Sequence, residues 1–198
     1  MCQYIETIRI ERGKPLNVKR HQQRLEATMK HFWPEADVPG LFEYLTDCPM
    51  EEKALKARIV YGEHGFVKKE YCPYSMRRIG SLRVVGCDLI NYEYKSLDRT
   101  MLEDLMSKRN GCDDILVIRN GLLTDTSYTN VALFDGYKWL TPKRPLLRGT
   151  MRQKLLEERL VEEADIPFSS IGDFRSLAMF NSMIDFCKII IDVKNIML

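Results

Sequence analysis

Three groups of residues in the second half of the sequence have side chains that could do chemistry together. Lys95 follows a strand-like run, Asp125 lies 30 positions further along, and Gly149-Thr150-Met151 forms a turn before a segment of helical pattern. A lysine amine can bond to an aldehyde carbon, a carboxylate can keep a ring nitrogen protonated, and free N–H groups at a helix start attract anions. A cofactor that handles amines and carries a phosphate tail requires these parts.

The composition is that of an ordinary soluble globular protein. The chain has 198 residues, of which 45% are hydrophobic and 29% are charged, with a net charge of +2. This length allows one medium domain or two small ones. Because the charge is nearly balanced, it gives no argument for binding nucleic acid or an anionic membrane. A small-molecule site is therefore the default expectation.

The sequence shows no targeting or membrane segment. No apolar run approaches the roughly 20 residues of a membrane span. The first residues lack the charged and apolar regions of a signal peptide. The six cysteines are scattered and form no CxxC pair: Cys2, Cys48, Cys72, Cys87, Cys112 and Cys187. We expect reduced thiols, a cytoplasmic protein and no metal site.

The three histidines give no support to a hydrolase. His21, His31 and His64 have no spacing to carboxylates or cysteines that indicates a metal site or a Ser-His-Asp system. We interpret them as structural residues, exposed or partly buried.

Pattern and turn residues predict an α/β (α+β) protein of two domains. In the first half we expect a strand at 4–10, a helix at 18–33 with Asn17 as its N-cap, a short helix at 37–45 and a hairpin at 54–70. In the second half we expect strands at 81–85, 89–94 and 187–191, helices at 97–109 and 151–164, and an antiparallel meander at 114–140. The predicted domains are a small α/β domain at 1–80 and a larger one at 81–198, with a mixed or barrel-like sheet.

Two further residues have roles that the local sequence leaves open. Arg24, on the first predicted helix, is either a solvated helix charge or a guanidinium fork for a phosphate. Ser182 either caps a turn or donates to an anion.

Taken together and in order, the motifs resemble one family. They are Glu6-Thr7-Ile8-Arg9, Gly13-Lys14-Pro15, the HQQRL segment at 21–25, Tyr94-Lys95, GLLTDTSYTN at 121–130, LTP at 140–142, LRGTMR at 147–152 and Asn181-Ser182. This series resembles the class IV aminotransferases, the pyridoxal-phosphate enzymes of fold type IV, and the resemblance covers nearly the whole chain. It implies a two-domain fold like that of D-amino-acid aminotransferase, pyridoxal 5'-phosphate as cofactor, a small-molecule amine as substrate, and a homodimer.

The resemblance also implies roles for individual residues. Lys95 falls at the Schiff-base lysine, Arg24 at the arginine that binds the cofactor phosphate, and Asp125 at the glutamate that faces the pyridine nitrogen. The remaining positions would contact the ring or complete the phosphate cradle: Leu147 against the ring, the N–H groups of Thr150 and Met151, and Ser182.

Three departures from the family pattern affect these roles. Asp125 is one methylene shorter than glutamate, and Met151 replaces a threonine and so lacks its hydroxyl. The chain also starts almost at the Glu-Thr-Ile-Arg strand, whereas typical members have a hairpin before it. We expect the lack of this hairpin to open part of the site or of the dimer contact.

The segment Lys95-Ser96-Leu97-Asp98-Arg99 resembles the lyase branch of the family more than the branched-chain transaminases. It implies the conversion of 4-amino-4-deoxychorismate to 4-aminobenzoate, a folate precursor, and pyruvate. The alternatives are a transaminase acting on a small or branched-chain amino acid with an α-keto acid, and a non-catalytic cofactor-binding relative. Arg99 and Thr7 are candidate substrate contacts, and Arg99 is equally interpretable as a structural ion-pair partner.

Overall fold

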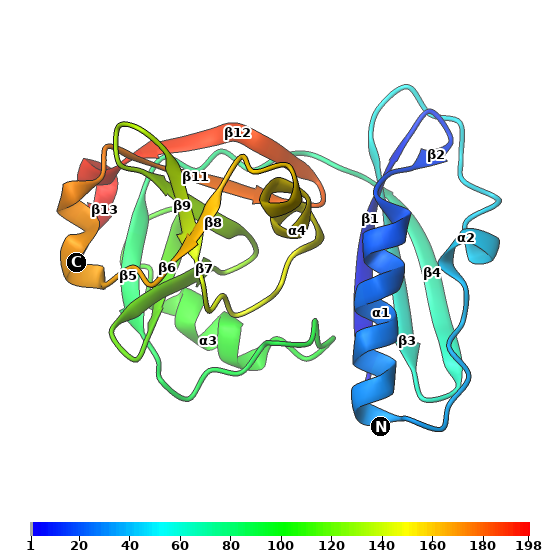
Figure 1. Ribbon diagram of the computed structural model, residues 1–198. Coiled ribbons are helices and arrows are strands. Elements are labelled where there is room, and N and C mark those ends of the chain that lie inside the picture. Colours follow the sequence, from blue (N-terminus) through cyan, green and yellow to red (C-terminus); the bar gives the residue numbers. More distant parts are fainter. Residues whose placement is uncertain (1) are drawn as a thin grey trace. The chain divides into compact units, whose positions relative to one another are not determined.

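The computed structural model describes residues 2–198, which form a mixed α+β structure with three sheets and few helices (Figure 1). The chain divides into two compact units. The first contains the chain up to Ser75 together with Tyr94–Asp98, and the second contains Met76–Glu93 and Arg99–Leu198. The segment Tyr94–Asp98, which includes Lys95, thus lies with the first unit, whereas the domain boundary predicted from the sequence puts it in the second domain.

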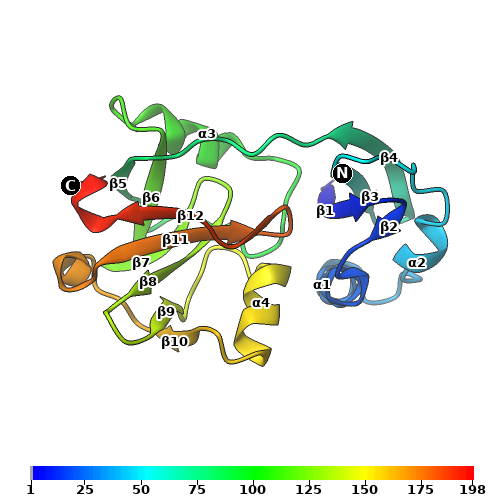
Figure 2. The same ribbon diagram turned by 90° about the horizontal axis from the view of Figure 1, so that it is seen from above.

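The first unit is a four-stranded sheet covered by a helix. Its strand order is β2-β1-β3-β4, with bounds Lys14–Pro15, Tyr4–Glu11, Leu55–Gly62 and Gly65–Pro73. The helix α1 (Val18–Phe32) runs along these strands and covers one face, and α2 (Leu41–Tyr44) is a single turn (Figures 1 and 2).

Side-chain alternation on β1 explains this packing. Tyr4, Ile8 and Ile10 are buried and share one face of the strand, where they pack with Leu25 and Met29 of α1. Glu6 has the same parity, so its carboxyl group enters this buried layer. One acidic residue therefore lies among apolar neighbours, in the position where β1 and α1 meet.

The second unit contains two sheets. One has the order β13-β5-β6-β7, with bounds Ile196–Met197, Leu82–Gly86, Asp114–Arg119 and Leu122–Thr126. The other has the order β10-β9-β8-β11-β12, with bounds Glu162–Ala164, Trp139–Pro142, Asn130–Phe134, Ser176–Asn181 and Ile184–Asp192. Helices α3 (Thr100–Ser107) and α4 (Thr150–Glu157) lie on opposite sides of these strands (Figure 2), and Phe168–Asp173 and Val193–Asn195 are short 3₁₀ turns.

Two predicted elements in this unit are wrong. The run 89–94, predicted as a strand, lies in the loop between β5 and α3, and Leu89 is 87% exposed because no strand pairs there. The helix predicted at 151–164 ends at Glu157. Arg159 is left-handed (φ 56°) and the Leu160 N–H donates to the Leu155 carbonyl at 2.9 Å, a Schellman ending, after which the chain forms β10.

Other properties concern the whole described chain. Among residues 2–198, none of the helices has the length and apolar character needed to cross a bilayer. All six cysteines are free thiols. Within the same residues, no group of histidine, cysteine or acidic side chains is arranged to hold a metal ion.

Candidate functional site

Arg24 and Glu6 form a buried, two-bonded ion pair in the first unit. Arg24 Nε donates to Glu6 Oε1 at 2.8 Å and Arg24 Nη2 donates to Glu6 Oε2 at 2.5 Å. Glu6 is fully buried and the Arg24 side chain is 13% exposed. His21, three residues earlier on α1 and fully buried, donates from Nδ1 to Glu6 Oε2 at 2.5 Å, since an ionised carboxylate can only accept. The expectation that His21 is exposed or only partly buried is therefore wrong.

The charges of this cluster determine its protonation. Burial raises the pKa of Glu6, but the charge of Arg24 and the hydrogen bonds from His21 and Arg24 outweigh burial, so the pKa falls to about 2. Burial lowers the pKa of His21, and although Glu6 raises it, the charges of Arg24 and Lys95 lower it further. Near neutral pH the cluster thus consists of a carboxylate, a guanidinium and a neutral imidazole.

Lys95 lies in a short segment that pairs with the start of β1. The Ile5 N–H donates to the Lys95 carbonyl at 2.9 Å, and the Leu97 N–H donates to the Gln3 carbonyl at 2.9 Å. The backbone of Lys95 is thereby fixed on the strand that carries Glu6. The Lys95 charge also contributes to the lowered pKa of His21, as the last of its causes.

Thr7 lies apart from this cluster. It follows Glu6 on β1, and successive side chains of a strand point to opposite faces of the sheet. The Thr7 side chain therefore faces away from the α1 side, where Arg24 and His21 lie.

Asp125 is the centre of the candidate residues in the second unit. It lies on β7, is 5% exposed, and accepts hydrogen bonds on both oxygens, from Asn130 Nδ2 at 2.9 Å and from the Leu147 N–H at 2.8 Å. Burial raises the pKa of Asp125 to about 6, although these two hydrogen bonds and the charge of Arg152 act in the opposite direction. Asp125 is therefore a buried carboxylate close to its titration point at neutral pH.

The turn before α4 packs directly on Asn130. A Cβ atom built on Gly149 would overlap Asn130 Oδ1, so this position requires glycine. Glycine offers no side-chain cap to α4, whose first N–H groups belong to Thr150 and Met151. Thr150 is 2% exposed. Met151 packs against an apolar cluster that includes Phe180, which leaves its N–H as the group suited to an anion.

Leu147 and Ser182 lie at the edges of this arrangement. The Leu147 carbonyl accepts from Asn130 Nδ2 at 2.8 Å, and its half-buried side chain packs against the core around Ile90 and Tyr92. Ser182 follows β11, whose Phe180 pairs with Asn130 of β8. Leu147 is thus bonded to Asn130, and Ser182 lies two residues after the strand residue that pairs with Asn130.

Arg99 has fixed protein partners. Its Nη1 donates to the Tyr92 hydroxyl at 3.1 Å and its Nη2 donates to the Ser127 carbonyl at 2.8 Å. The sequence leaves Arg99 open as a substrate contact or as a structural ion-pair partner. The structure shows two structural partners, but they are a hydroxyl and a carbonyl, not an acidic group.

The structure adds two residues that the sequence analysis did not assign to the site, Glu6 and Asn130. The sequence does contain a hint of the role of Glu6. Among Tyr4, Glu6, Ile8 and Ile10, which share one face of β1, it is the one acidic residue. For Asn130 the sequence contains no such hint, since the role of this residue depends on the turn that returns β8 beside β7.

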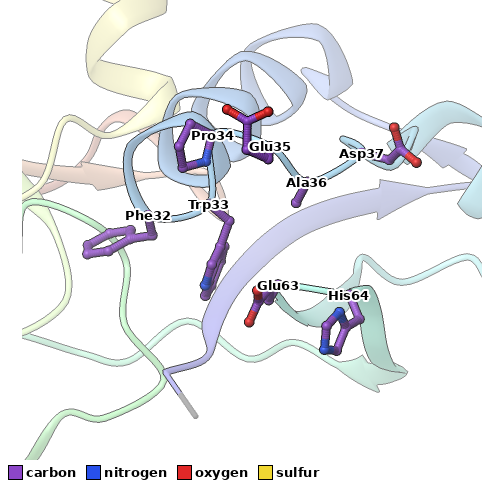
Figure 3. Close-up of a pocket in the computed structure, with 8 residues that line it drawn as sticks. All are labelled: Phe32, Trp33, Pro34, Glu35, Ala36, Asp37, Glu63 and His64. Atoms are coloured by element: carbon purple, nitrogen blue, oxygen red, sulfur yellow. The ribbon is translucent and has the colours of Figure 1, made fainter.

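Pockets in the two units lie elsewhere. One of about 590 Å³ lies between the end of α1 and the β3–β4 turn, lined by Phe32, Trp33, Pro34, Glu35, Ala36, Asp37, Glu63 and His64 (Figure 3). Another of about 500 Å³, in the second unit, is lined by residues that include Asp88, Arg119 and Arg144. None of the candidate residues described above lines either pocket.

Comparisons with known proteins show which family the chain resembles. Residues 87–190 match the family model described as amino-transferase class IV. An uncharacterised protein of Haemophilus influenzae is 33% identical over 186 residues, which cover 92% of this chain and 98% of that protein. A crystal structure from Haemophilus somnus, described as a "putative 4-amino-4-deoxychorismate lyase", is 32% identical, has a TM-score of 0.88, and covers 93% of this chain and 98% of its own.

A more distant structure shows the same fold. A hypothetical aminotransferase from Mycobacterium tuberculosis in its PLP-bound form has a TM-score of 0.78 at 18% identity, and the match covers 93% of this chain and 78% of that one. Because the family model spans more than half of the 198 residues, the chain belongs to the class IV aminotransferase family.

Proposed function

We propose that this protein is a pyridoxal-phosphate-dependent lyase that converts 4-amino-4-deoxychorismate to 4-aminobenzoate and pyruvate. The observation that carries the proposal is the buried carboxylate of Asp125, in a chain 32% identical to the Haemophilus somnus protein described as a putative lyase of this kind. A carboxylate at this depth is unfavourable to folding unless it serves a partner, because burial disfavours its charge.

The residues present fit this cofactor. A protonated pyridine nitrogen would provide a cationic partner for the buried Asp125 carboxylate, which has about four acceptor sites and uses three of them for the bonds from Asn130, Leu147 and the Leu146 backbone. The start of α4 at Thr150 and Met151 suits a phosphate by N–H direction and helix dipole. The proposal therefore requires Asp125 to accept from the ring nitrogen despite being shorter than glutamate.

The same proposal assigns the remaining positions. Arg24, held on Glu6, would contribute a guanidinium to the phosphate, and Ser182 would add a hydroxyl or N–H. Leu147 would pack against the ring. Thr7 is kept as a candidate substrate contact, although its side chain faces the opposite side of the sheet from Arg24. Lys95 and Arg24 belong to the first unit, and Asp125, Leu147, Thr150, Met151 and Ser182 belong to the second.

The chemistry assigns Lys95 to proton transfer. When bound, pyridoxal phosphate withdraws electrons from the carbon that bears the substrate amine. Lys95 Nζ takes the proton from that carbon, the bond from the ring to the enolpyruvyl oxygen breaks, and the six-membered ring becomes aromatic. Enolpyruvate leaves and, on gaining a proton, becomes pyruvate. An amine of ordinary pKa near 10.4 is mostly charged at pH 7, so Lys95 needs nearby positive charge or burial to act as a base.

The lyase assignment within the family rests on the residues after Lys95. The order Lys95, Ser96, Leu97, Asp98 and Arg99 is similar to the lyase pattern. The similarity to the Haemophilus somnus structure supports the same choice. We further propose, from the family resemblance and the free thiols, that the protein is a homodimer of the cytoplasm; light scattering of the purified protein tests the dimer.

A single assay separates the lyase from a transaminase. Purified protein loaded with pyridoxal phosphate receives 4-amino-4-deoxychorismate without any keto acid, and pyruvate release is followed by lactate dehydrogenase. The proposal predicts many turnovers per protein and none from Lys95→Ala. Turnover of an amino acid that depends on an added keto acid, without pyruvate release, would replace the lyase by a transaminase. Absence of both activities would favour a non-catalytic relative.

A further inference from the structure

Tyr92 and Arg99, which flank the segment carrying Lys95, are bonded to each other. Arg99 Nη1 donates to the Tyr92 hydroxyl at 3.1 Å, and the Arg99 guanidinium carbon lies 5.6 Å from the centre of the Tyr92 ring. We call this pair the clasp. It closes a loop in the chain, and the stretch between its two members contains Lys95.

One member of the clasp lies in the core of the second unit, and the other is partly buried at the start of a helix. Tyr92 is 8% exposed and packs in the cluster that contains Leu102 and Leu105 of α3. Arg99 is the N-cap residue of the same helix, and its carbonyl accepts from the Glu103 N–H at 2.9 Å. The clasp is thus part of packed structure on both sides, unlike a pair of solvated side chains.

The same guanidinium has a second tie, to the turn that follows Asp125. Arg99 Nη2 donates to the Ser127 carbonyl at 2.8 Å, and Ser127 is 7% exposed. Hydrogen bonds close this turn: the Thr126 N–H donates to the Thr129 carbonyl at 2.9 Å, and the two threonine hydroxyls lie 2.7 Å apart. One side chain therefore bonds both to the base of the Lys95 loop and to the turn two residues after Asp125.

We propose that Arg99 is a positioning residue. With Tyr92, it closes the loop 92–99 that carries Lys95, and its own side chain is fixed by the Ser127 carbonyl. Its effect on the reaction then passes through Lys95, and not through a bond to a substrate carboxylate. This proposal rests on the proposed function, because it assumes that Lys95 acts on the cofactor.

The first test needs no cofactor. Hydrogen exchange is measured on peptides covering 93–98 in Tyr92→Phe, which keeps the ring and removes the acceptor, and in Arg99→Gln. The matched control is Arg109→Gln, an exposed arginine just beyond the other end of α3. We expect exchange of the Leu97 amide to accelerate about tenfold in both clasp variants, the effect of losing one hydrogen bond to a charged group. The control should exchange like the parent protein, and unchanged exchange in both clasp variants would overturn the proposal.

The second test uses the loaded protein. A positioning role predicts that both clasp variants shift the pH midpoint of the cofactor absorption band and lower kcat at least tenfold, with KM within about threefold of the parent. Arg99→Lys should not restore them, because an ammonium cannot reach both partners as the planar fork does. If Arg99 binds substrate instead, Arg99→Gln raises KM, leaves the pH midpoint unchanged, and Tyr92→Phe behaves like the parent. That result would overturn the proposal.

The two tests also separate this proposal from the proposed function. A parent protein that takes up no pyridoxal phosphate would refute the proposed function, and the role through Lys95 would fall with it. Hydrogen exchange would still report whether the clasp holds the segment. A parent that binds cofactor, with normal exchange and pH midpoint in both clasp variants, would refute the positioning role alone.

Discussion

Replacing Glu6 by glutamine should destabilise the first unit far more than a surface substitution of the same kind. The Glu6 carboxylate is fully buried and accepts from Arg24 on both oxygens and from His21 on one. Glutamine is nearly isosteric, but it has one acceptor oxygen and no charge. Arg24, which is 13% exposed, would then be a nearly buried cation without its carboxylate partner.

Two estimates of the cost agree. The fall of the Glu6 pKa from 4.5 to about 2 corresponds to about 3 kcal/mol of stabilisation of the charged form. Removing one member of a buried ion pair typically costs about 3–5 kcal/mol. We therefore expect Glu6→Gln to lower the free energy of unfolding by about 3 kcal/mol at pH 7.

The pH dependence follows from the sign of the shift. Because the pKa of Glu6 is lower in the folded than in the unfolded state, its stabilisation is complete above pH 4.5 and is lost as pH falls toward about 2. The difference in stability between the parent and Glu6→Gln should thus be constant from pH 7 to 5 and shrink below pH 4.5.

Urea unfolding followed by circular dichroism measures these differences. The matched control is Glu70→Gln, which removes a carboxylate that is 35% exposed and 3.2 Å from Arg58; it should cost less than about 1 kcal/mol. A double-mutant cycle with Arg24→Gln should give a coupling energy of at least about 1.5 kcal/mol. A cost for Glu6→Gln no larger than that for Glu70→Gln, or one that does not change down to pH 3, would refute the reasoning.

Two further predictions concern the second unit. Burial raises the pKa of Asp125 from 3.8 to about 6, so its charge destabilises the cofactor-free fold above pH 6 and this effect disappears toward pH 4. Relative to Asp125→Asn, the parent should gain up to about 3 kcal/mol between pH 7 and 4 in urea unfolding, and parallel curves would contradict this. Gly149→Ala should displace the Asn130 amide that its Cβ overlaps and cost about 1–3 kcal/mol. Gly172→Ala, where a Cβ meets nothing within 4 Å, should change thermal stability little, and equal effects of the two would count against the packing argument.

Local signals predicted much of the fold. Alternation and the Asn120-Gly121 turn predicted the strands between 114 and 140, and the apolar spacing of Leu25 and Met29 predicted α1. The end of α4 was not predictable, because Arg159 adopts a positive φ without being glycine. The run 89–94 has an apolar pattern but no neighbouring strand, and pairing depends on the whole sheet.

The sequence allowed the residues of the candidate site to be predicted, but not the contacts that those residues make. Lys95 and Asp125 stand out by type and order in the sequence. The partner of Arg24 could not be read from α1, since Glu6 lies 18 positions away on β1 and meets it only through packing. Asn130 likewise reaches Asp125 only because the chain turns between β7 and β8.

Covalent trapping of the cofactor tests the central claim most directly. The purified protein is incubated with pyridoxal phosphate, reduced with borohydride, digested and examined by mass spectrometry, with Lys95→Arg treated in parallel. The account predicts one dominant cofactor-bearing peptide, the one containing Lys95, and no such peptide from Lys95→Arg. Labelling spread over surface lysines, or labelling that persists unchanged in Lys95→Arg, would contradict it.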